Sequence, residues 1–369
     1  IDKNKVSLFK DKISYDSIVL KDCDIFIVTV PTPITKRKLP NISFVKNATK
    51  IAARYMTKNS TFILESTVYP GLTEEICLPI IEKITKLKCN YKKDIGGFHI
   101  GYSPERVNPG DKDHRIDNTI KIISASSLYG LKKIEYIYSK VTKNNLHISP
   151  SIKVAEAAKI IENIQRDLNI ALMNELHKLF NKMEIDTKEV LKAANTKWNF
   201  HNFVPGLVGG HCISVDPYYL TFKAKKLQFN PKVILAGRDT NDSMPIFYAK
   251  KIKSVIEKKL GKSKKIKLLL CGITFKKNVP DIRNSKSIDL SRILLKYGYK
   301  LSVFDPIFSK NDTETRIPLD FKNKLLSNEK FDCIVFCVDH NFFKNKGISF
   351  FKKHLYSKNS IIIDLVNTF

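Results

Sequence analysis

The sequence lacks the features that mark membrane, secreted and zinc-binding proteins. No apolar run in its 369 residues approaches the roughly 18 residues of a membrane span. The N-terminal segment 1–16 carries charges throughout and has no apolar stretch typical of a signal peptide. None of the seven cysteines forms a C-x-x-C pair, and their number is odd, which argues against a disulfide framework or a zinc site. We therefore predict a cytoplasmic protein that binds no metal and inserts into no membrane.

The chain also lacks a Gly-rich dinucleotide turn. None of its 14 glycines belongs to a G-x-G-x-x-G motif. In a Rossmann fold that motif holds pyrophosphate, and an acidic residue about 20 positions later holds a ribose. Gly272 follows an apolar run, but no second glycine stands two positions after it.

Acidic residues are few beside basic ones. The chain has 64 Lys and Arg against 36 Asp and Glu, a net charge of +28. Such a charge is typical of nucleic-acid-binding proteins. However, the lysines are spread along the whole chain, and there is no zinc-finger, RNP or Arg-rich segment. We therefore predict no nucleic-acid partner, and we expect the basic surface to attract a small, doubly anionic ligand.

The N-terminal part of the sequence shows an alternation of predicted strands and helices. Apolar runs at 24–30, 61–66 and 98–104 indicate buried parallel strands, and each one ends in a polar loop. An amphipathic helix is expected at 43–57, and another starting near Thr73. Open α/β sheets bind ligands at the carboxyl ends of their strands, so these polar loops are candidate binding segments.

The middle of the chain is helical. Residues 151–183 contain neither Gly nor Pro and predict one helix of about 30 residues. A second helix is predicted at 187–194 after Asp186, which is a good N-cap. A Gly-rich loop follows at 205–217, and helix is then expected to about residue 260. A helix this long commonly forms a spine between domains or a dimer interface.

The C-terminal third repeats the α/β pattern. A helix is expected at 285–298, and strands are expected at 265–272, 299–306, 331–340 and 359–365. The predicted organisation therefore has three parts: an α/β domain over 1–150, a helical domain over 151–260 and a second α/β domain over 261–369.

The Gly-rich loop carries the strongest chemical signal. Cys212 comes two residues after the pair Gly209-Gly210, whose missing side chains would let a substrate approach the sulfur. Asp216 lies four residues on and could act on a water or orient a base. A thiol of this kind suits oxidation of an aldehyde to an acid through a thiohemiacetal and a thioester. A single cysteine is more often structural, and a cysteine protease using the adjacent His211 is disfavoured because neighbouring side chains in an extended loop point apart.

The long predicted helix carries a polar stripe. Lys159, Asn163 and Arg166 are spaced i, i+4, i+7 and share one face, with Glu156 less than a turn before Lys159. Such a stripe is usually a solvated surface. A lysine and an amide in this position would also suit binding of an oxyanion and orientation of a water.

Seven segments, in order, carry a resemblance to a known family. They are VPTP (30–33), ESTVYPG (65–71), YSPERVNPGD (102–111), KVAEAAKIIENIQRDLNIALMNE (153–175), TKWNF (196–200), PGLVGGHCISVDPYYL (205–220) and GITFKKNVPDIRNS (272–285). Together they resemble the UDP-glucose/UDP-N-acetylhexosamine 6-dehydrogenases, most of all the UDP-N-acetylglucosamine enzymes of bacterial surface-polysaccharide synthesis. The resemblance implies two NAD-dependent oxidations of the sugar C6 alcohol to a carboxylate, and a homodimer formed through the central helix.

The resemblance also assigns roles to residues. It implies a catalytic set consisting of the nucleophile Cys212, the oxyanion-stabilising Lys159, Asn163 beside it, the water-activating Asp216, and Thr67 with Glu105 at the NAD and water side. It implies NAD contacts from Thr32, Thr67 and Arg283. It implies that the nucleotide sugar is held by Arg106, Val107, Lys159, Asn163, Arg166, Gly206, Phe275 and Lys276.

The sequence departs from the family pattern at both ends. The expected fold is α/β, with two Rossmann-like domains joined by a long central helix, the first lacking its N-terminal β-α-β unit and its G-x-G-Y-V-G turn. Either the chain is a fragment of a longer protein or it is an inactive relative that still binds the UDP-sugar. Near the C-terminus, Val366 stands where the family often has a lysine. UDP-N-acetylglucosamine is the expected substrate, with the N-acetylgalactosamine, N-acetylmannosamine and glucose analogues left open.

Overall fold

The computed structural model divides the chain into two compact units. The first comprises Ile1–Glu162 and Tyr218–Asn230, and the second Asn163–Pro217 and Pro231–Phe369. The residues described are 14–92, 96–108, 110–111, 113–262, 265–308, 320–322 and 324–369. Most of the charged N-terminal segment therefore lies outside the described residues. Within the ranges given, no helix is both long and apolar enough to cross a lipid bilayer.

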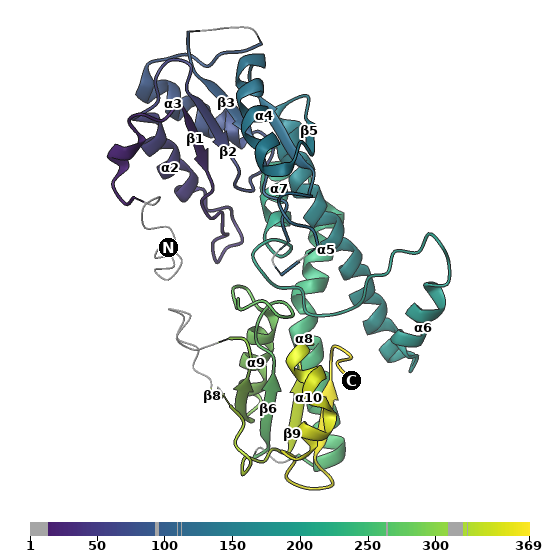
Figure 1. Cartoon of the computed structure of the whole chain (residues 1–369). Coiled ribbons are helices and arrows are strands. Elements are labelled where there is room, and N and C mark those ends of the chain that lie inside the picture. Colours follow the sequence, from purple (N-terminus) through teal and green to yellow (C-terminus); the bar gives the residue numbers. More distant parts are fainter. Residues whose placement is uncertain are drawn as a thin grey trace. The chain divides into compact units, whose positions relative to one another are not determined.

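The first unit contains a five-stranded sheet in the order β1-β2-β3-β4-β5 (Figure 1). Its strands are β1 (Ile25–Val28), β2 (Thr61–Leu64), β3 (His99–Tyr102), β4 (Lys121–Ala125) and β5 (Leu146–Ile148). The three strands predicted in this part of the chain are confirmed as β1, β2 and β3, each somewhat shorter than expected. All neighbours are parallel except β3 and β4, which are antiparallel. The described residues of the β3–β4 connection contain no crossover helix, so the chain returns in the opposite direction.

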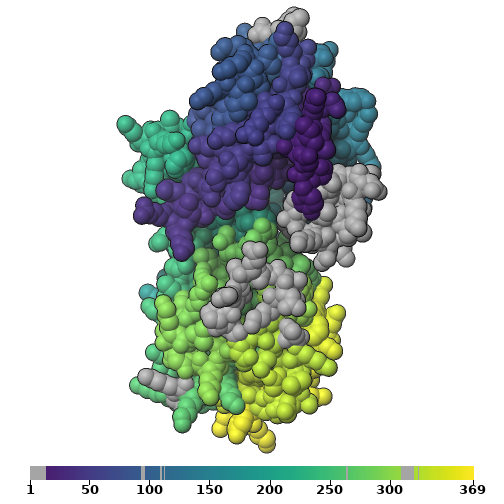
Figure 2. Space-filling view, turned by 90° about the vertical axis from the view of Figure 1, so that its left-hand side faces the viewer, coloured from purple at the N-terminus to yellow at the C-terminus, as the bar shows by residue number. Residues whose placement is uncertain are grey.

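Helices flank this sheet. They are α2 (Ser43–Ala53), α3 (Leu78–Thr85), which follows a π-helical turn η3 (Thr73–Cys77), and α4 (Leu128–Thr142). α2 contacts β1 and α3, whereas α4 contacts β2, β3, β4 and β5. The short helix η2 (Ser17–Leu20) lies on the surface of this unit, in the purple segment of Figure 2.

The central part of the chain is helical, as predicted. α5 (Ile152–Lys182) is continuous over 31 residues, which confirms the long helix. It is followed by α6 (Thr187–Ala194), α7 (Asp216–Lys226) and α8 (Lys232–Leu260). Asp186 caps α6 as expected, because its side chain accepts a hydrogen bond from the N–H of Lys188 at 2.8 Å.

The second unit contains an all-parallel sheet in the order β10-β9-β6-β7-β8. Its strands are β6 (Lys267–Cys271), β7 (Lys300–Phe304), β8 (Asp320–Lys322), β9 (Cys333–Phe336) and β10 (Ile361–Asp364). From β6 the chain first adds strands on one side, and then returns to place β9 on the other side. The carboxyl ends of β6 and β9 therefore form the topological switch point, where doubly wound sheets bind ligands.

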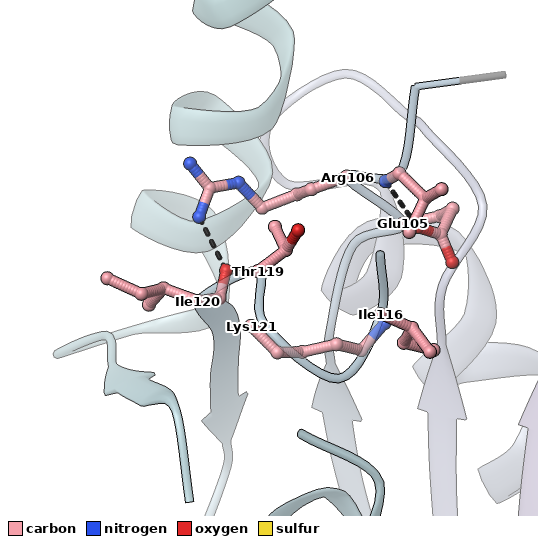
Figure 3. A pocket seen from close by; sticks show the side chains of 7 residues that line it. Glu105, Arg106, Ile116, Thr119, Ile120 and Lys121 are labelled. Carbon is pink, nitrogen blue, oxygen red and sulfur yellow. Dashed lines mark hydrogen bonds between the residues drawn. The ribbon is translucent and has the colours of Figure 1, made fainter. Parts of the chain in front are cut away.

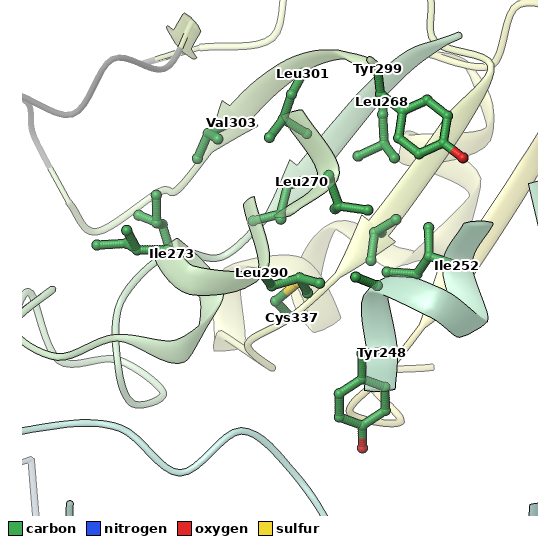
Figure 4. Close-up of a cluster of buried hydrophobic side chains, with 14 of the residues drawn as sticks. Tyr248, Ile252, Leu268, Leu270, Ile273, Leu290, Tyr299, Leu301, Val303 and Cys337 are labelled. Carbon is green, nitrogen blue, oxygen red and sulfur yellow. The ribbon is translucent and has the colours of Figure 1, made fainter. Parts of the chain in front are cut away.

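Both faces of this second sheet are covered. Leu268 and Leu270 point into a cluster that includes residues of α8 and of α9 (Lys286–Lys296), shown in Figure 4. Leu269 and Cys271 point the other way, into a cluster with Phe343 of α10 (Asn341–Lys352). Because alternate residues are buried on opposite faces, the strand appears in the sequence as one unbroken apolar run.

Candidate active site

Cys212 lies in a turn that directly precedes α7, and the turn needs both glycines before it. Gly210 has φ of +91°, and a Cβ there would come within 2.7 Å of the Phe275 ring. A Cβ on Gly209 would come within 2.6 Å of the carbonyl oxygen of Asn284. The glycines therefore allow the turn to pack against the loop between β6 and α9. The Cys212 side chain is half-buried, so part of it remains accessible.

Asp216 is held beside this turn by α5. The Asp216 N–H donates to the carbonyl oxygen of Cys212 at 2.9 Å, so the thiol and the carboxylate belong to one turn. The Asn163 side-chain amide donates to Asp216 Oδ2 at 2.5 Å, and Asp216 is only 3% exposed. Lys159, which is 8% exposed, lies one turn earlier on α5. The structure thus brings the predicted water-activating carboxylate and the predicted amide into direct contact.

A guanidinium lies within electrostatic range of the thiol. Arg283 pairs with Asp281 through Nε–Oδ2 and Nη2–Oδ2 contacts of 2.9 and 2.6 Å. The hydrogen bond with Asp281 raises the pKa of Arg283, burial opposes that rise, and the charges of Asp281 and Cys212 add to it. His211 Nδ1 is 3.6 Å from Asp281 Oδ2, and its ring packs edge-on against Phe275.

In the first unit, two polar loops are tied together at the carboxyl ends of β1 and β2. The Ser66 hydroxyl donates to the carbonyl oxygen of Val30 at 2.7 Å. Thr32 and Thr67, two of the three predicted NAD contacts, lie on these two loops and are half-buried. Parallel strand ends carrying hydroxyl groups are where open α/β sheets accept dinucleotides, so the residues present fit NAD.

Glu156 on α5 anchors the second of these loops. Its carboxylate accepts hydrogen bonds from the Gly71 N–H at 2.5 Å, the Thr73 N–H at 2.9 Å and the Thr73 hydroxyl at 2.6 Å. Burial raises the pKa of Glu156 to about 7, while these three donors oppose the rise. Glu156 does not belong to a solvated polar stripe of the helix, because it is fully buried and fixes the loop that carries Thr67.

Arg106 bridges two elements beside a small open pocket (Figure 3). Its Nη2 lies 2.8 Å from Glu162 Oε1 on α5, and its Nη1 donates to the carbonyl oxygen of Ile120 at 2.6 Å. Glu105 accepts the N–H of Val107 at 2.5 Å, which tightens the same loop. The pocket is lined by Glu105, Arg106, Val107, Ile116, Thr119, Ile120 and Lys121.

A buried lysine supports the loop that carries Arg106. Lys121 is 5% exposed, and its ammonium group lies 3.2 Å from Glu65 Oε1. It also donates to the carbonyl oxygen of Pro104 at 3.1 Å, just before Glu105. Nothing in the sequence singled out Lys121, because its partners lie in distant segments.

The remaining predicted residues are placed as follows. Gly206 is clamped by Asn174: its N–H donates to Asn174 Oδ1 at 2.8 Å, and its carbonyl oxygen accepts from Asn174 Nδ2 at 3.1 Å. Arg166 is exposed on α5, and Lys276 is half-buried in the loop after β6. Sequence reasoning missed Asn174, although it falls about three helical turns after Asn163 and so shares its face.

The predicted residues fall into two sets, one in each unit. The first unit holds Thr32, Thr67, Glu105, Arg106, Val107 and Lys159. The second unit holds Asn163, Arg166, Gly206, Cys212, Asp216, Phe275, Lys276 and Arg283. Across the described ranges, no cluster of three or more His, Cys, Asp or Glu side chains is arranged to hold a metal ion.

Comparison with known proteins identifies the family. Three domain models of the UDP-glucose/GDP-mannose dehydrogenase family match the chain: the NAD-binding domain over 7–142, the central domain over 153–243 and the UDP-binding domain over 269–369. The UDP-N-acetyl-D-glucosamine 6-dehydrogenase of Pseudomonas aeruginosa is 44% identical over 346 residues, which cover 94% of this chain and 80% of the relative. The chain belongs to this family.

Members that act on another sugar are also similar. The UDP-N-acetyl-D-mannosamine dehydrogenase of Methanocaldococcus jannaschii is 30% identical, over 99% of this chain and 81% of the relative. The solved structure of the UDP-D-ManNAc dehydrogenase from Pyrococcus horikoshii matches 100% of this chain and 84% of its own length, with a TM-score of 0.85 at 28% identity. The chain is therefore an NAD-dependent nucleotide-sugar dehydrogenase, and its predicted α/β fold with a long central helix is confirmed.

Proposed function

We propose that this dehydrogenase oxidises the C6 alcohol of a UDP-N-acetylhexosamine, with UDP-N-acetylglucosamine as the preferred substrate, to the uronic acid. The choice of sugar rests on the 44% identity to the Pseudomonas relative, against 30% for the N-acetylmannosamine enzyme. The observation that carries the chemistry is the Cys212 turn, where a partly accessible thiol shares one turn with a buried carboxylate and lies within electrostatic range of a guanidinium. An odd number of cysteines with no C-x-x-C pair suits the reducing cytoplasm, where we place the enzyme.

The residues of the turn suit the second oxidation. The first oxidation leaves an aldehyde at C6, and the Cys212 thiolate adds to its carbonyl carbon to form a thiohemiacetal. Loss of hydride from that carbon gives a thioester, and a water activated by Asp216 cleaves it to the acid and restores the thiol. Lys159 stabilises the developing oxyanion, and Asn163 orients the Asp216 carboxylate through their 2.5 Å hydrogen bond.

The cofactor and the nucleotide are assigned to loops at strand ends. NAD, when bound, supplies the acceptor for the hydride of each oxidation. Thr32 and Thr67 would hold it in the first unit, and Arg283 would contact it in the second. Phe275 and Lys276 would hold the UDP group. Arg106, Val107, Arg166 and Gly206 would complete the contacts to the nucleotide sugar.

We further propose that the enzyme is a homodimer formed through α5. One face of this helix carries Val154, Ile161, Leu172 and Leu179, which are 47%, 55%, 53% and 49% exposed. Their spacings are close to two, three and two whole turns, so they form one straight stripe about 37 Å long. An exposed apolar stripe of this length is typical of a helix that packs against a second copy.

A cysteine substitution tests the chemistry. Cys212→Ser should still bind the UDP-sugar but stall before the acid is released, so that NADH formation falls well below two per sugar consumed. Cys23→Ser is the matched control, because Cys23 is also half-buried but lies outside the turn. A panel of the four UDP-sugars, compared by kcat/KM, tests the substrate. A Cys212→Ser protein that releases uronic acid at the wild-type rate would reject the mechanism.

A further inference from the structure

A buried cluster formed by Asp305 and His340, at the switch point of the second sheet, holds the loop after β6 through hydrogen bonds. This loop, residues 273–278, contains Phe275 and Lys276, which the proposed function assigns to UDP. Asp305 directly follows β7, and His340 stands at the start of α10 after β9. Asp305 is 2% exposed and His340 is fully buried, so neither is available to contact a ligand directly.

Both carboxylate oxygens of Asp305 accept hydrogen bonds from backbone N–H groups. Its Oδ2 accepts the N–H groups of Ile273 at 2.7 Å and Thr274 at 3.2 Å. Its Oδ1 accepts those of Ile307 at 2.9 Å and Phe308 at 3.1 Å. Burial raises the pKa of Asp305, but the hydrogen bond with His340, the electrostatic attraction of that ring and these backbone donors outweigh it and leave the pKa below its usual value. The carboxylate therefore stays charged and fixes the start of the loop.

The hydrogen bonds around His340 allow only one tautomer. The Asn278 N–H donates to His340 Nδ1 at 3.0 Å, so Nδ1 carries no proton. The proton is then on Nε2, which lies 3.2 Å from Asp305 Oδ2 and 3.1 Å from Thr274 Oγ1. The Thr274 hydroxyl proton is given to the carbonyl oxygen of Lys276 at 3.1 Å, which leaves Thr274 Oγ1 free to accept from Nε2. Donors and acceptors in the cluster thus match completely.

The same contacts hold the loop at its far end. Asn278 has φ of +57°, in the left-handed region that costs energy for a residue with a side chain. Its Oδ1 accepts the N–H of Asn341 at 3.1 Å, one residue after His340. The start of α10 therefore binds both the backbone and the side chain of Asn278.

We infer that His340 is a positioning residue for UDP: with its Nδ1 accepting from Asn278 and its Nε2 facing Asp305, it joins Asp305 to Asn278 and so fixes the loop that presents Phe275 and Lys276. This inference rests on the proposed UDP contacts of those two residues. His340 itself touches no ligand. Its effect is on the conformation of the loop, and so on affinity for the nucleotide.

Two substitutions test the contributions of the two ring nitrogens of His340 separately. In His340→Asn, the amide oxygen takes the place of Nδ1 and can still accept from Asn278. In His340→Gln, the amide nitrogen takes the place of Nε2 and can still donate to Asp305, but the Asn278 N–H loses its buried acceptor. A buried donor without a partner is costly, so we expect UDP affinity, measured by calorimetry with UDP alone, to fall about 5- to 100-fold in His340→Gln. His340→Asn should rescue most of this loss.

Control measurements distinguish a positioning role of His340 from a general folding defect. His354 is also buried, at 4% exposure, and its Nδ1 bonds to the Glu329 carbonyl oxygen before β9 begins. His354→Gln should leave UDP affinity unchanged. In turnover, His340→Gln should raise KM for the UDP-sugar while KM for NAD stays constant. In the wild type, nitrogen NMR should show an imine-type Nδ1 and a pyrrole-type Nε2 for His340.

The outcomes distinguish this inference from the proposed function. Wild-type UDP affinity in His340→Gln, equal losses in His340→Gln and His354→Gln, or a protonated Nδ1 in the wild type would overturn the role of His340. If Phe275→Ala and Lys276→Ala both leave UDP binding unchanged, the proposed contacts are wrong and the inference falls with them. Weakened binding in those two variants together with an unaffected His340→Gln would reject the inference alone. The NMR measurement decides even if a His340 variant does not fold.

Discussion

Gly210→Ala tests whether the shape of the cysteine turn controls catalysis. At φ of +91° an added Cβ strains the backbone, by about 1–2 kcal/mol in the left-handed region. The same Cβ would lie 2.7 Å from Cδ2 of Phe275, where carbon atoms normally approach to about 3.5–4.0 Å. Either the ring or the turn must therefore move by about 1 Å. A displacement of this size at a reacting group can cost about 100-fold in rate, so we expect kcat/KM to fall by roughly that factor.

The control variant Gly261→Ala separates the effect of backbone strain from that of the collision with Phe275. Gly261 has φ of +80°, but a Cβ there would meet no atom within 4 Å. Both variants should lose free energy of unfolding through backbone strain, a few degrees in Tm by thermal scanning, and Gly210→Ala should lose at least as much as Gly261→Ala because of the added collision. Only Gly210→Ala should lose NADH formation and show an altered rate of alkylation at Cys212. If the two variants match in Tm and Gly210→Ala keeps wild-type kcat/KM, then the packing of the turn against Phe275 has no role in catalysis.

Three further predictions concern other contacts. Because burial raises the pKa of Glu156 from 4.5 to about 7, the folded state binds this proton more tightly than the unfolded chain does. The free energy of unfolding should therefore fall by up to about 3 kcal/mol as the pH rises from 4.5 to above 7, and Glu156→Gln should remove this component; an unchanged pH slope in thermal scans would contradict it. Leu172→Lys should convert the proposed dimer to monomer in sedimentation, whereas Leu326→Lys, at a similar exposure of 55%, should not; a dimeric Leu172→Lys protein would exclude the α5 stripe as the interface. Arg106→Lys cannot hold Glu162 and the Ile120 carbonyl together, so KM for the UDP-sugar should rise about tenfold, and an unchanged KM would show that the bridge does not shape the site.

The long elements of the fold could be predicted because their patterns are strong. α5 has no Gly or Pro, and β6 is an apolar run because both faces of its sheet are covered. Several of the elements that were not predicted have weak or mixed patterns. β5 has only three residues, β4 begins with a buried lysine, and α10 contains a non-helical Gly347 at φ of +68°. These elements form because of tertiary packing, which short-range periodicity does not record.

The site could be predicted only where residues act together over a short span. The glycines and the thiol of the 209–212 segment are close together in the sequence. Two residues without side chains next to a cysteine are enough to predict a tight turn that leaves the sulfur accessible. The pairs of residues that hold the site in place are far apart in the sequence. Asn163 and Asp216 are 53 positions apart, and His340 and Asn278 are 62 apart. Nothing in their local sequence specifies the pairing, because it depends on how α5, α7 and the β6 and β9 loops meet in the fold.

The second sheet shows how one architecture can be adapted to another ligand. A dinucleotide-binding sheet uses an acidic residue at the end of its second strand to hold a ribose. Asp305 occupies that position after β7, yet both of its oxygens accept hydrogen bonds from backbone N–H groups of the unit itself. The helix that would offer its N-terminus to pyrophosphate, α9, does not begin until Lys286, well beyond the end of β6. In this unit the acidic residue is occupied by the backbone and the helix N-terminus lies far along the chain. The proposed recognition of UDP by side chains of the loop between β6 and α9 therefore depends on how that loop is held.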